Sequence, residues 1–343
     1  MIADPPAIGR VPEGTERPFW SVMIPVYNCA HLLRETLSSV LAQDPGPERM
    51  QIEVVDDCST KDDPEAVVRE LAGDRVHFYR QPKNQGAITT FNTCAQRSRG
   101  RWVHILHGDD TIRPGFYERA ERAILSQPEI GAVFFRYIYM FEDGHWQHLS
   151  ELESRRPTVL GEEFQRRMLL TNEIMFPAMI VRREVYETLG GFRPQLVHCA
   201  DWDMWTRTTM RYPVFYDPEP LACYRVHAGA DTARLVKSGE NVEDERRFVD
   251  VLASYVPPAE RRSVYRRGRK AAAVRAIRRA QDLWRKGHRD TAYVQLREAV
   301  KTSLDPAVII HLVRVAAWAT VREPSNSPSA QDLKPAVRRS DAR

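Results

Sequence analysis

The segment IEVVDDCSTKDDPEAVVRELAG, residues 52–73, contains one complete strand-and-helix unit. Its first six residues include three β-branched apolar side chains and are strand-like, and residues 65–73 carry apolar side chains at helical spacing. Pro64 suits the first turn of a helix, and Gly73 suits the position just past its end. The segment therefore predicts a β-strand followed directly by an α-helix.

The same unit recurs on both sides of this segment. Residues 20–28 and 31–43 predict a strand and a helix. Residues 76–80, 88–100 and 101–107 predict a strand, a helix and a further strand. Strands that alternate with helices imply right-handed crossovers and a mainly parallel sheet. The sequence contains neither GxGxxG after its first strand nor GxxxxGK[ST], so it predicts neither a dinucleotide-binding fingerprint nor a P-loop.

The rest of the chain divides by composition. We expect a flexible, Pro-rich lead-in over residues 1–18 and one α/β domain over residues 19–240. Residues 241–322 predict a basic helical region, which contains a helical hairpin broken at a Lys-Gly-His sequence. Residues 323–343 have the composition of a disordered tail.

The charge and the hydropathy of the chain limit the classes of protein to which it can belong. The net charge is only +4, but residues 255–301 contain 14 Lys or Arg and 4 Asp or Glu, a local charge of +10. This basic face could be a solvated helix surface, a contact for an anionic membrane, or a contact for nucleic acid. The apolar residues 306–321 are too few to span a bilayer.

The five cysteines are scattered and odd in number, with no CxxC pair, so they predict neither a zinc site nor a disulfide framework. The N-terminus lacks a basic stretch followed by an apolar one, the pattern of a secretory signal. We therefore expect a cytoplasmic protein, which could sit peripherally at the inner face of the membrane.

Two acidic pairs follow predicted strands. In sheets of this kind, ligands bind beyond the carboxyl ends of the strands. Asp57, in VVDDCST, could accept a hydrogen bond from a nucleobase, or it could only shape a turn. Asp109 and Asp110, in LHGDD, could hold a divalent cation on a phosphorylated substrate, or form a turn of their own.

Two later motifs carry further polar groups. Asp201, in ADWDMW, could act as a general base or only cap a helix. Arg225 and His227, in YRVHAG, could offer a cation and an imidazole to a diphosphate or to its metal. A single histidine is more often a surface or core residue than a ligand.

The motifs occur in one order over residues 21–229: SVMIPVYN, VVDDCST, LHGDD, LGGF, ADWDMWTR and YRVHAG. This order resembles the family 2 inverting glycosyltransferases. The resemblance implies the α/β GT-A fold, a Rossmann-like, mainly parallel central sheet flanked by helices, here with a C-terminal helical extension. It covers about two thirds of the chain.

The resemblance also implies roles for particular residues. Pro25 and Tyr27 would lie along the nucleobase, with Asp57 accepting from its ring N–H, which suits uracil, thymine or guanine. Asp109 would contact the nucleotide ribose and, with Asp110, the metal. His227 would contact the diphosphate or the metal, and Asp201 would be the catalytic base.

Two positions depart from the common pattern of the family. His107 stands where many members have the first aspartate of the acidic motif, and Ala200 stands where a glutamate often precedes the base. Metal binding would then depend on Asp109 and Asp110, helped by His227. Weak metal affinity or a changed metal preference is the expected consequence.

The implied reaction moves a sugar from a UDP, dTDP or GDP sugar to an acceptor hydroxyl, assisted by Mn²⁺ or Mg²⁺. The acceptor could be a glycan, a lipid-linked molecule or a small molecule. One alternative is a non-catalytic protein that binds sugar nucleotides or carbohydrate on the same fold. A second alternative, nucleic-acid binding, is not expected, because it leaves the acidic motifs unexplained.

Overall fold

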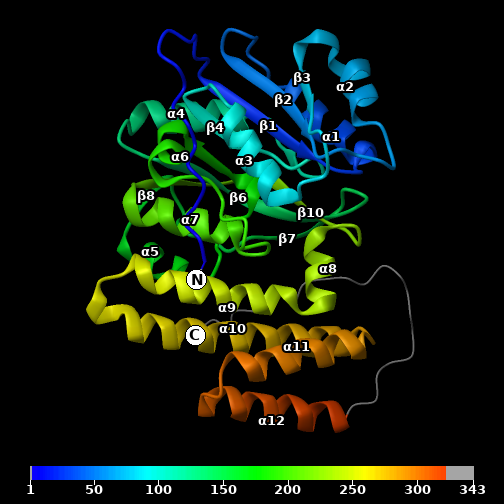
Figure 1. Cartoon of the computed structure of the whole chain (residues 1–343), viewed down its shortest axis with the longest axis vertical. Coiled ribbons are helices and arrows are strands. Elements are labelled where there is room, and N and C mark those ends of the chain that lie inside the picture. The colour runs from blue at the N-terminus through cyan, green and yellow to red at the C-terminus, as the bar shows by residue number, and fades with distance from the viewer. Residues whose placement is uncertain (1, 322–343) are drawn as a thin grey trace.

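The computed structural model describes residues 2–321 of the chain (Figure 1). One sheet has the strand order β3-β2-β1-β4-β9-β6-β10-β5, with β7 beside β6 and β8 beside β10. The strands are β1 Trp20–Val26, β2 Met50–Asp56, β3 His77–Arg80, β4 Trp102–Ile105, β5 Thr111–Ile112, β6 Ala132–Phe141, β7 Trp146–Leu149, β8 Thr158–Leu160, β9 Met179–Arg182 and β10 Val214–Val226.

The long strands share one direction except for β9. β1 pairs in parallel with β2 and β4, β2 with β3, and β6 with β10. β9 lies between β4 and β6 and is antiparallel to both. The sheet is thus mainly parallel, as the alternating pattern predicted, and the edge strands β5, β7 and β8 add antiparallel pairs.

Helices cover both faces of this sheet. They are α1 Ala30–Leu41, α2 Pro64–Ala72, α3 Ala87–Arg97, α4 Phe116–Ser126, α5 Glu162–Met168, α6 Arg183–Leu189 and α7 Ala200–Arg211. One buried cluster includes side chains of α1, α2 and α4, and a second includes α3, α6 and α7. The predicted start of α2 is confirmed: Asp63 accepts a hydrogen bond from the amide of Ala66 at 3.1 Å, and Pro64 is the first helical residue.

The lead-in that we expected to be flexible lies against this domain. The amide of Gly191 donates to the carbonyl of Pro6 at 2.8 Å. Arg183, almost fully buried, donates from Nη2 to the carbonyl of Gly9 at 2.9 Å. The segment is polar and Pro-rich, but hydrogen bonds from the domain to its backbone carbonyls hold it in place.

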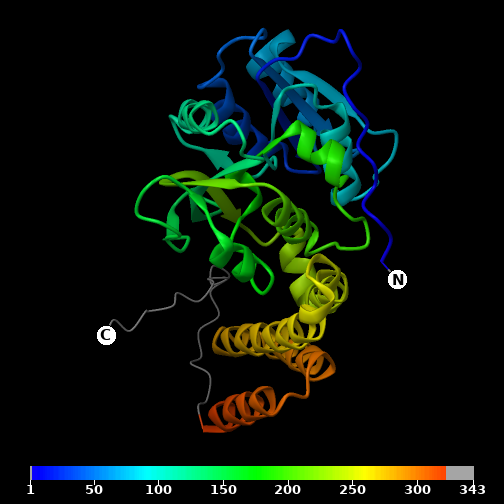
Figure 2. The same ribbon diagram turned by 90° about the vertical axis from the view of Figure 1, so that its left-hand side faces the viewer.

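A stack of helices lies below the sheet domain in both views (Figures 1 and 2). These helices are α8 Asp231–Ser238, α9 Glu240–Leu252, α10 Pro258–Arg285, α11 Arg289–Thr302 and α12 Pro306–Val321. The hairpin of α10 and α11 breaks where predicted, at Gly287, whose φ of +82° favours glycine.

Small side chains let these helices approach closely. Ala273, Ala276 and Ile277 of α10 pack with Val242 of α9 and Val308 of α12. The hairpin therefore buries its faces against neighbouring helices of the same chain. Within residues 2–321, no helix has the length and apolarity needed to cross a membrane. The predicted disordered tail, residues 323–343, lies outside the described residues.

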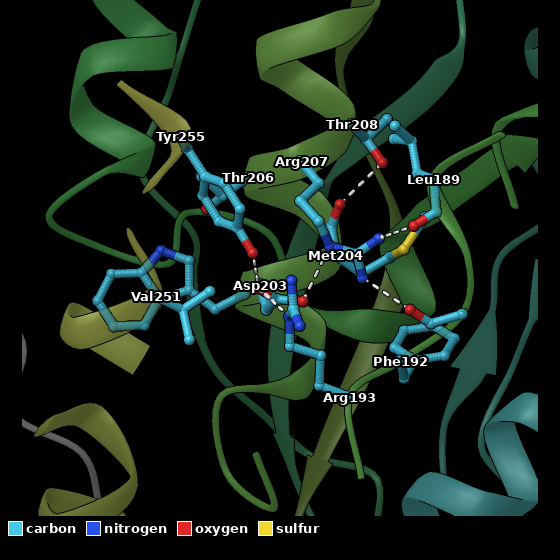
Figure 3. A network of polar contacts seen from close by, with 12 residues as sticks. Leu189, Phe192, Arg193, Asp203, Met204, Thr206, Arg207, Thr208, Val251 and Tyr255 are labelled. Carbon is cyan, nitrogen blue, oxygen red and sulfur yellow. Dashed lines mark hydrogen bonds and ion pairs between the residues drawn. The ribbon is translucent and has the colours of Figure 1, made fainter. Parts of the chain in front are cut away.

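A buried carboxylate joins the sheet domain to the helical stack (Figure 3). Asp203 of α7 is fully buried and accepts hydrogen bonds from Arg207 Nε, at 2.9 Å, and from the hydroxyl of Tyr255. Arg193 Nε lies 3.5 Å from the same carboxylate. Tyr255 belongs to the 3₁₀ turn Ala253–Tyr255, which connects α9 to α10.

Arg207 extends this contact to the LGGF turn. Its two terminal nitrogens donate to the carbonyls of Leu189, at 2.8 Å, and Gly191, at 2.7 Å. Asp203 is therefore a structural residue that orients α7.

We expect Asp203→Ala to lower the free energy of unfolding by about 3–5 kcal/mol, because it leaves two buried guanidinium groups without their carboxylate. Urea denaturation followed by circular dichroism measures this. Asp250→Ala, an exposed site on α9, is the matched control and should change stability by less than about 0.5 kcal/mol. Equal effects of the two substitutions would contradict the role assigned to Asp203.

Candidate active site

Four strands that run in one direction end at the same edge of the sheet. β1 ends at Val26, β2 at Asp56, β4 at Ile105 and β10 at Val226. Most residues selected from the sequence lie within a few positions after these ends; Pro25 lies within β1, and Asp201 lies elsewhere. The sheet thus gathers segments separated by up to about two hundred positions, as expected of a parallel sheet.

The acidic loop after β4 is held by one buried arginine. The amide of Arg225 donates to Asp110 Oδ1, and its Nε donates to the carbonyl of Asp109, each at 2.8 Å. Its terminal nitrogens donate to the carbonyl of Glu142, at 2.6 Å, and to the Glu35 carboxylate, at 2.5 Å. All three side-chain nitrogens of Arg225 therefore bind protein oxygens, and Arg225 holds the loop rather than presenting a free cation to a diphosphate.

The two carboxyl groups of this loop have opposed pKa shifts. Burial, together with the neighbouring charge of Asp109, raises the pKa of Asp110 well above its ordinary value. Burial also opposes ionisation of Asp109, but the hydrogen bond from His227 Nε2, at 2.9 Å, and the nearby imidazoles lower the pKa of Asp109. The pair thus carries one negative charge readily, and a second only when a further cation is present.

His107 completes a set of possible metal ligands. Its ring stacks on Phe91, with centroids 4.7 Å apart, and touches Phe176, at 4.3 Å. Ligand atoms of His107, Asp109 and Asp110 all lie within 4.8 Å of one another, the one such group among the described residues. Nε2 of His107 and Oδ2 of Asp110 are buried and have no hydrogen-bond partner within residues 2–321. The nitrogen and oxygen donors suit a divalent transition metal.

A close backbone approach fixes the acidic loop against β1. The amide of Gly108 donates to the carbonyl of Pro25 at 3.0 Å. A Cβ on Gly108 would lie 2.5 Å from Cγ1 of Val26, closer than real contacts allow, so this position requires glycine. Pro25 is thus buried beneath the loop. Tyr27, two residues further along the chain, is about half exposed.

Strained backbone marks the ends of β1 and β2. Asn28 and Cys58 are the non-glycine residues with positive φ, 52° and 61°, among the described residues. Asn28 Oδ1 accepts from the amides of Thr60, at 2.9 Å, and Lys61, at 3.0 Å, which ties the two strand ends together. Such conformations occur preferentially at functional sites.

Asp57 organises the loop that follows β3. Its Oδ1 accepts from Gln81 Nε2 and from the amide of Gln85, and its Oδ2 accepts from the amide of Gly86, each at 2.8 Å. Its neighbour Asp56 is fully buried and pairs with Arg80 Nε at 2.7 Å. Asp57 therefore has a positioning role, and any contact with a nucleobase would be additional.

Asp201 stands in the first turn of α7, outside the set of strand ends. Its Oδ1 accepts from the amide of Trp202 at 2.7 Å, and its Oδ2 accepts from Asn172 Nδ2 at 3.0 Å. Burial raises the pKa of Asp201 to about 6, against these two hydrogen bonds, which lower it. A carboxylate of this kind is more basic than an exposed one and is still ionised at neutral pH.

One aromatic ring connects Asp201's helix to the acidic loop. Phe176 packs against His107, at 4.3 Å between centroids, and against Trp205 of α7, at 5.4 Å. Phe176 is the first residue of the 3₁₀ turn Phe176–Ala178, which follows the segment that carries Asn172. Phe176 therefore joins the helix that carries the candidate base to the acidic loop.

Sequence reasoning overlooked two residues of this site. Asn172 lies in MLLTNEIMF, where its polar side chain follows an apolar stretch, but no spacing links it to Asp201. His107 replaces a carboxylate of the family's common pattern, but an imidazole is itself a metal ligand. The ability of an imidazole to bind a metal was therefore the feature of the sequence that could have identified His107.

Comparison with known proteins bears on the family and the fold of this chain. Residues 21–190 match the family model described as glycosyl transferase family 2. The uncharacterised protein MT1568 of Mycobacterium tuberculosis is 31% identical over 268 residues, which cover 75% of this chain and 81% of that protein.

Solved structures share the fold at low sequence identity. TarS 1-349 of S. aureus, in complex with UDP-GlcNAc, has a TM-score of 0.62 at 16% identity, covering 88% of this chain and 90% of that one. The mannosyltransferase PcManGT of Pyrobaculum calidifontis, in complex with GDP-Man and Mn²⁺, has a TM-score of 0.52 at 21% identity. That match covers 93% of this chain and 84% of the other. The likeness confirms the GT-A architecture of the sheet domain.

Proposed function

Because the chain belongs to glycosyltransferase family 2, we propose that it transfers a sugar from a nucleoside-diphosphate sugar to an acceptor hydroxyl with inversion. The observation that carries this proposal is a carboxylate with raised pKa, Asp201, on the helix that packs through Trp205 and Phe176 against His107 of the candidate metal cluster. A protein that only binds sugar nucleotides has no need of a general base. UDP, dTDP and GDP sugars are the candidate donors.

We propose that Asp201 takes the proton from the acceptor hydroxyl as the new glycosidic bond forms. Asn172 would hold the carboxylate in place through Oδ2. A carboxylate oxygen that accepts a proton needs a free lone pair. Within residues 2–321, each oxygen of Asp201 accepts one hydrogen bond, so each keeps a lone pair for this purpose. Tyr27, exposed beside buried Pro25, offers a flat ring on which the nucleobase could lie, with Asp57 near its polar edge.

Asp109 and Asp110, with His107, are proposed to hold a divalent cation, Mn²⁺ or Mg²⁺. When bound, such a cation neutralises the charge that develops on the leaving diphosphate. His227, which donates to Asp109, would orient that carboxylate from outside the ligand set or contact the diphosphate itself. Arg225 would keep the loop in its binding conformation.

Asp201→Asn should lower the rate of sugar transfer by about 10²–10⁴-fold, because the amide cannot accept the acceptor's proton. Affinity for the nucleotide should stay nearly unchanged. Transfer is measured as release of nucleoside diphosphate, and nucleotide affinity by calorimetry. Asp250→Asn, which removes a carboxylate charge from an exposed site on α9, is the control and should transfer sugar as the wild type does. Wild-type turnover in Asp201→Asn would remove Asp201 from this role.

Turnover of the wild type should fall on the acid side with an apparent pKa near 6, since protonated Asp201 cannot act as a base. Asn172→Ala removes a hydrogen bond that lowers this pKa, so the acid limb should move to higher pH. A plot of kcat/KM against pH measures both effects. An acid limb that stays in place in Asn172→Ala would show that another group titrates.

Asp110→Asn should weaken Mn²⁺ binding at least about tenfold, because it removes a buried ligand charge. His107→Asp should shift preference from Mn²⁺ toward Mg²⁺, which favours oxygen ligands. The paramagnetic resonance signal of free Mn²⁺, titrated with UDP present, gives the affinity without any turnover. Unchanged Mn²⁺ affinity in Asp110→Asn would exclude this loop as the metal site.

A further inference from the structure

A cationic groove lies between α10 and the end of α5, and nothing in the proposed reaction uses it. Its volume is about 390 Å³. Leu170, Ala271 and Val274 supply apolar lining, and Arg267, Lys270 and Arg278 supply positive charge. The positions on α10 recur every three or four residues, so they form one face of that helix.

The positive charge of this groove is poorly neutralised. Arg267 and Arg278 are exposed, and within the described part of the chain neither has an ion pair or a hydrogen bond. Lys270 Nζ lies 3.2 Å from Asp305. Arg278 also lies close enough to His311 of α12 for its charge, together with burial, to lower the pKa of that imidazole. Uncompensated guanidinium groups around a concave surface are suited to an anion.

The groove lies next to residues that neighbour the candidate base in the chain. Arg275, which also lines the groove, donates from Nη1 to the carbonyl of Leu170 at 2.6 Å. Its guanidinium lies 5.0 Å from the ring of Trp202, the residue after Asp201. Thr171 at the groove precedes Asn172, which donates to Asp201.

The donor diphosphate would lie elsewhere, at the strand ends that carry Asp109 and Asp110. An anion in the groove would therefore belong to the molecule whose hydroxyl reaches Asp201. We propose that the groove binds a phosphate group of the sugar acceptor, so that the acceptor is a phosphorylated glycan or glycolipid. This inference rests on the proposed function, because it names the acceptor class of the same site.

The test uses the full chain in EDTA, where the acidic loop has no cation and repels anions. Calorimetry with inorganic pyrophosphate should show binding that weakens as salt is added. The double variant Arg267→Gln/Arg278→Gln should lose affinity about tenfold or more, since two charged donors are removed. Arg262→Gln, an exposed arginine of α10 away from the groove, is the matched control and should bind as the wild type does.

Thermal unfolding of each variant shows that the fold is kept. Pyrophosphate binding that is equal in the wild type and the double variant, or equally weakened by Arg262→Gln, would overturn the proposal. So would the absence of binding by the wild type. Co-sedimentation with phosphatidylcholine vesicles, with and without phosphatidic acid, distinguishes the source of the phosphate. Binding that needs phosphatidic acid and is lost in the double variant indicates a lipid-linked acceptor, and pyrophosphate binding alone indicates a soluble one.

Failure of the groove assignment can be distinguished from failure of the proposed function. If the wild type hydrolyses nucleotide sugars with Mn²⁺ but does not bind pyrophosphate in EDTA, only the groove assignment fails. If it binds pyrophosphate at the groove but neither hydrolyses nor transfers any sugar nucleotide, the proposed function fails.

Discussion

The arrangement of the site depends on the buried contact between Arg225 and the acidic loop. Two adjacent carboxylates at the edge of a hydrophobic sheet repel each other and lose hydration, so the loop needs fixed donors to exist at all. Arg225 supplies them from β10, through its amide to Asp110 and through its side chain to the carbonyl of Asp109. With the loop so held, Gly108 can lie against β1 and His107 can lie beside the carboxylates.

The order of strands and helices could be predicted because local composition determines it. Segments such as residues 52–73 combine β-branched runs, a capping Asp and an N-terminal Pro, and the structure reproduces them. The GT-A fold and the family were likewise recognisable from the order of the motifs. The contacts of the lead-in were not, because the carbonyls of Pro6 and Gly9 accept from residues more than a hundred and seventy positions away and no local pattern records them.

The individual site residues were harder to predict than the fold. A motif shows which side chains are present, but only the packed structure shows which of their donors are already used. Arg225 looked like a cation for a ligand, and its nitrogens instead bind protein oxygens. His107 looked like a missing ligand, but its ring lies beside the carboxylates, and its buried Nε2 has no hydrogen-bond partner in the described part of the chain. Both corrections depend on burial, which is a property of tertiary structure.

The placement of Phe176 has a consequence for how such an enzyme can diverge. On one side this ring contacts His107 of the acidic loop, and on the other it contacts Trp205 of α7, the helix that carries Asp201, whose partner is Asn172. Substitutions in α10 can therefore alter the second side without disturbing the hydrogen bonds of the first. A gene duplicate could in this way acquire a new acceptor while inheriting its donor chemistry intact.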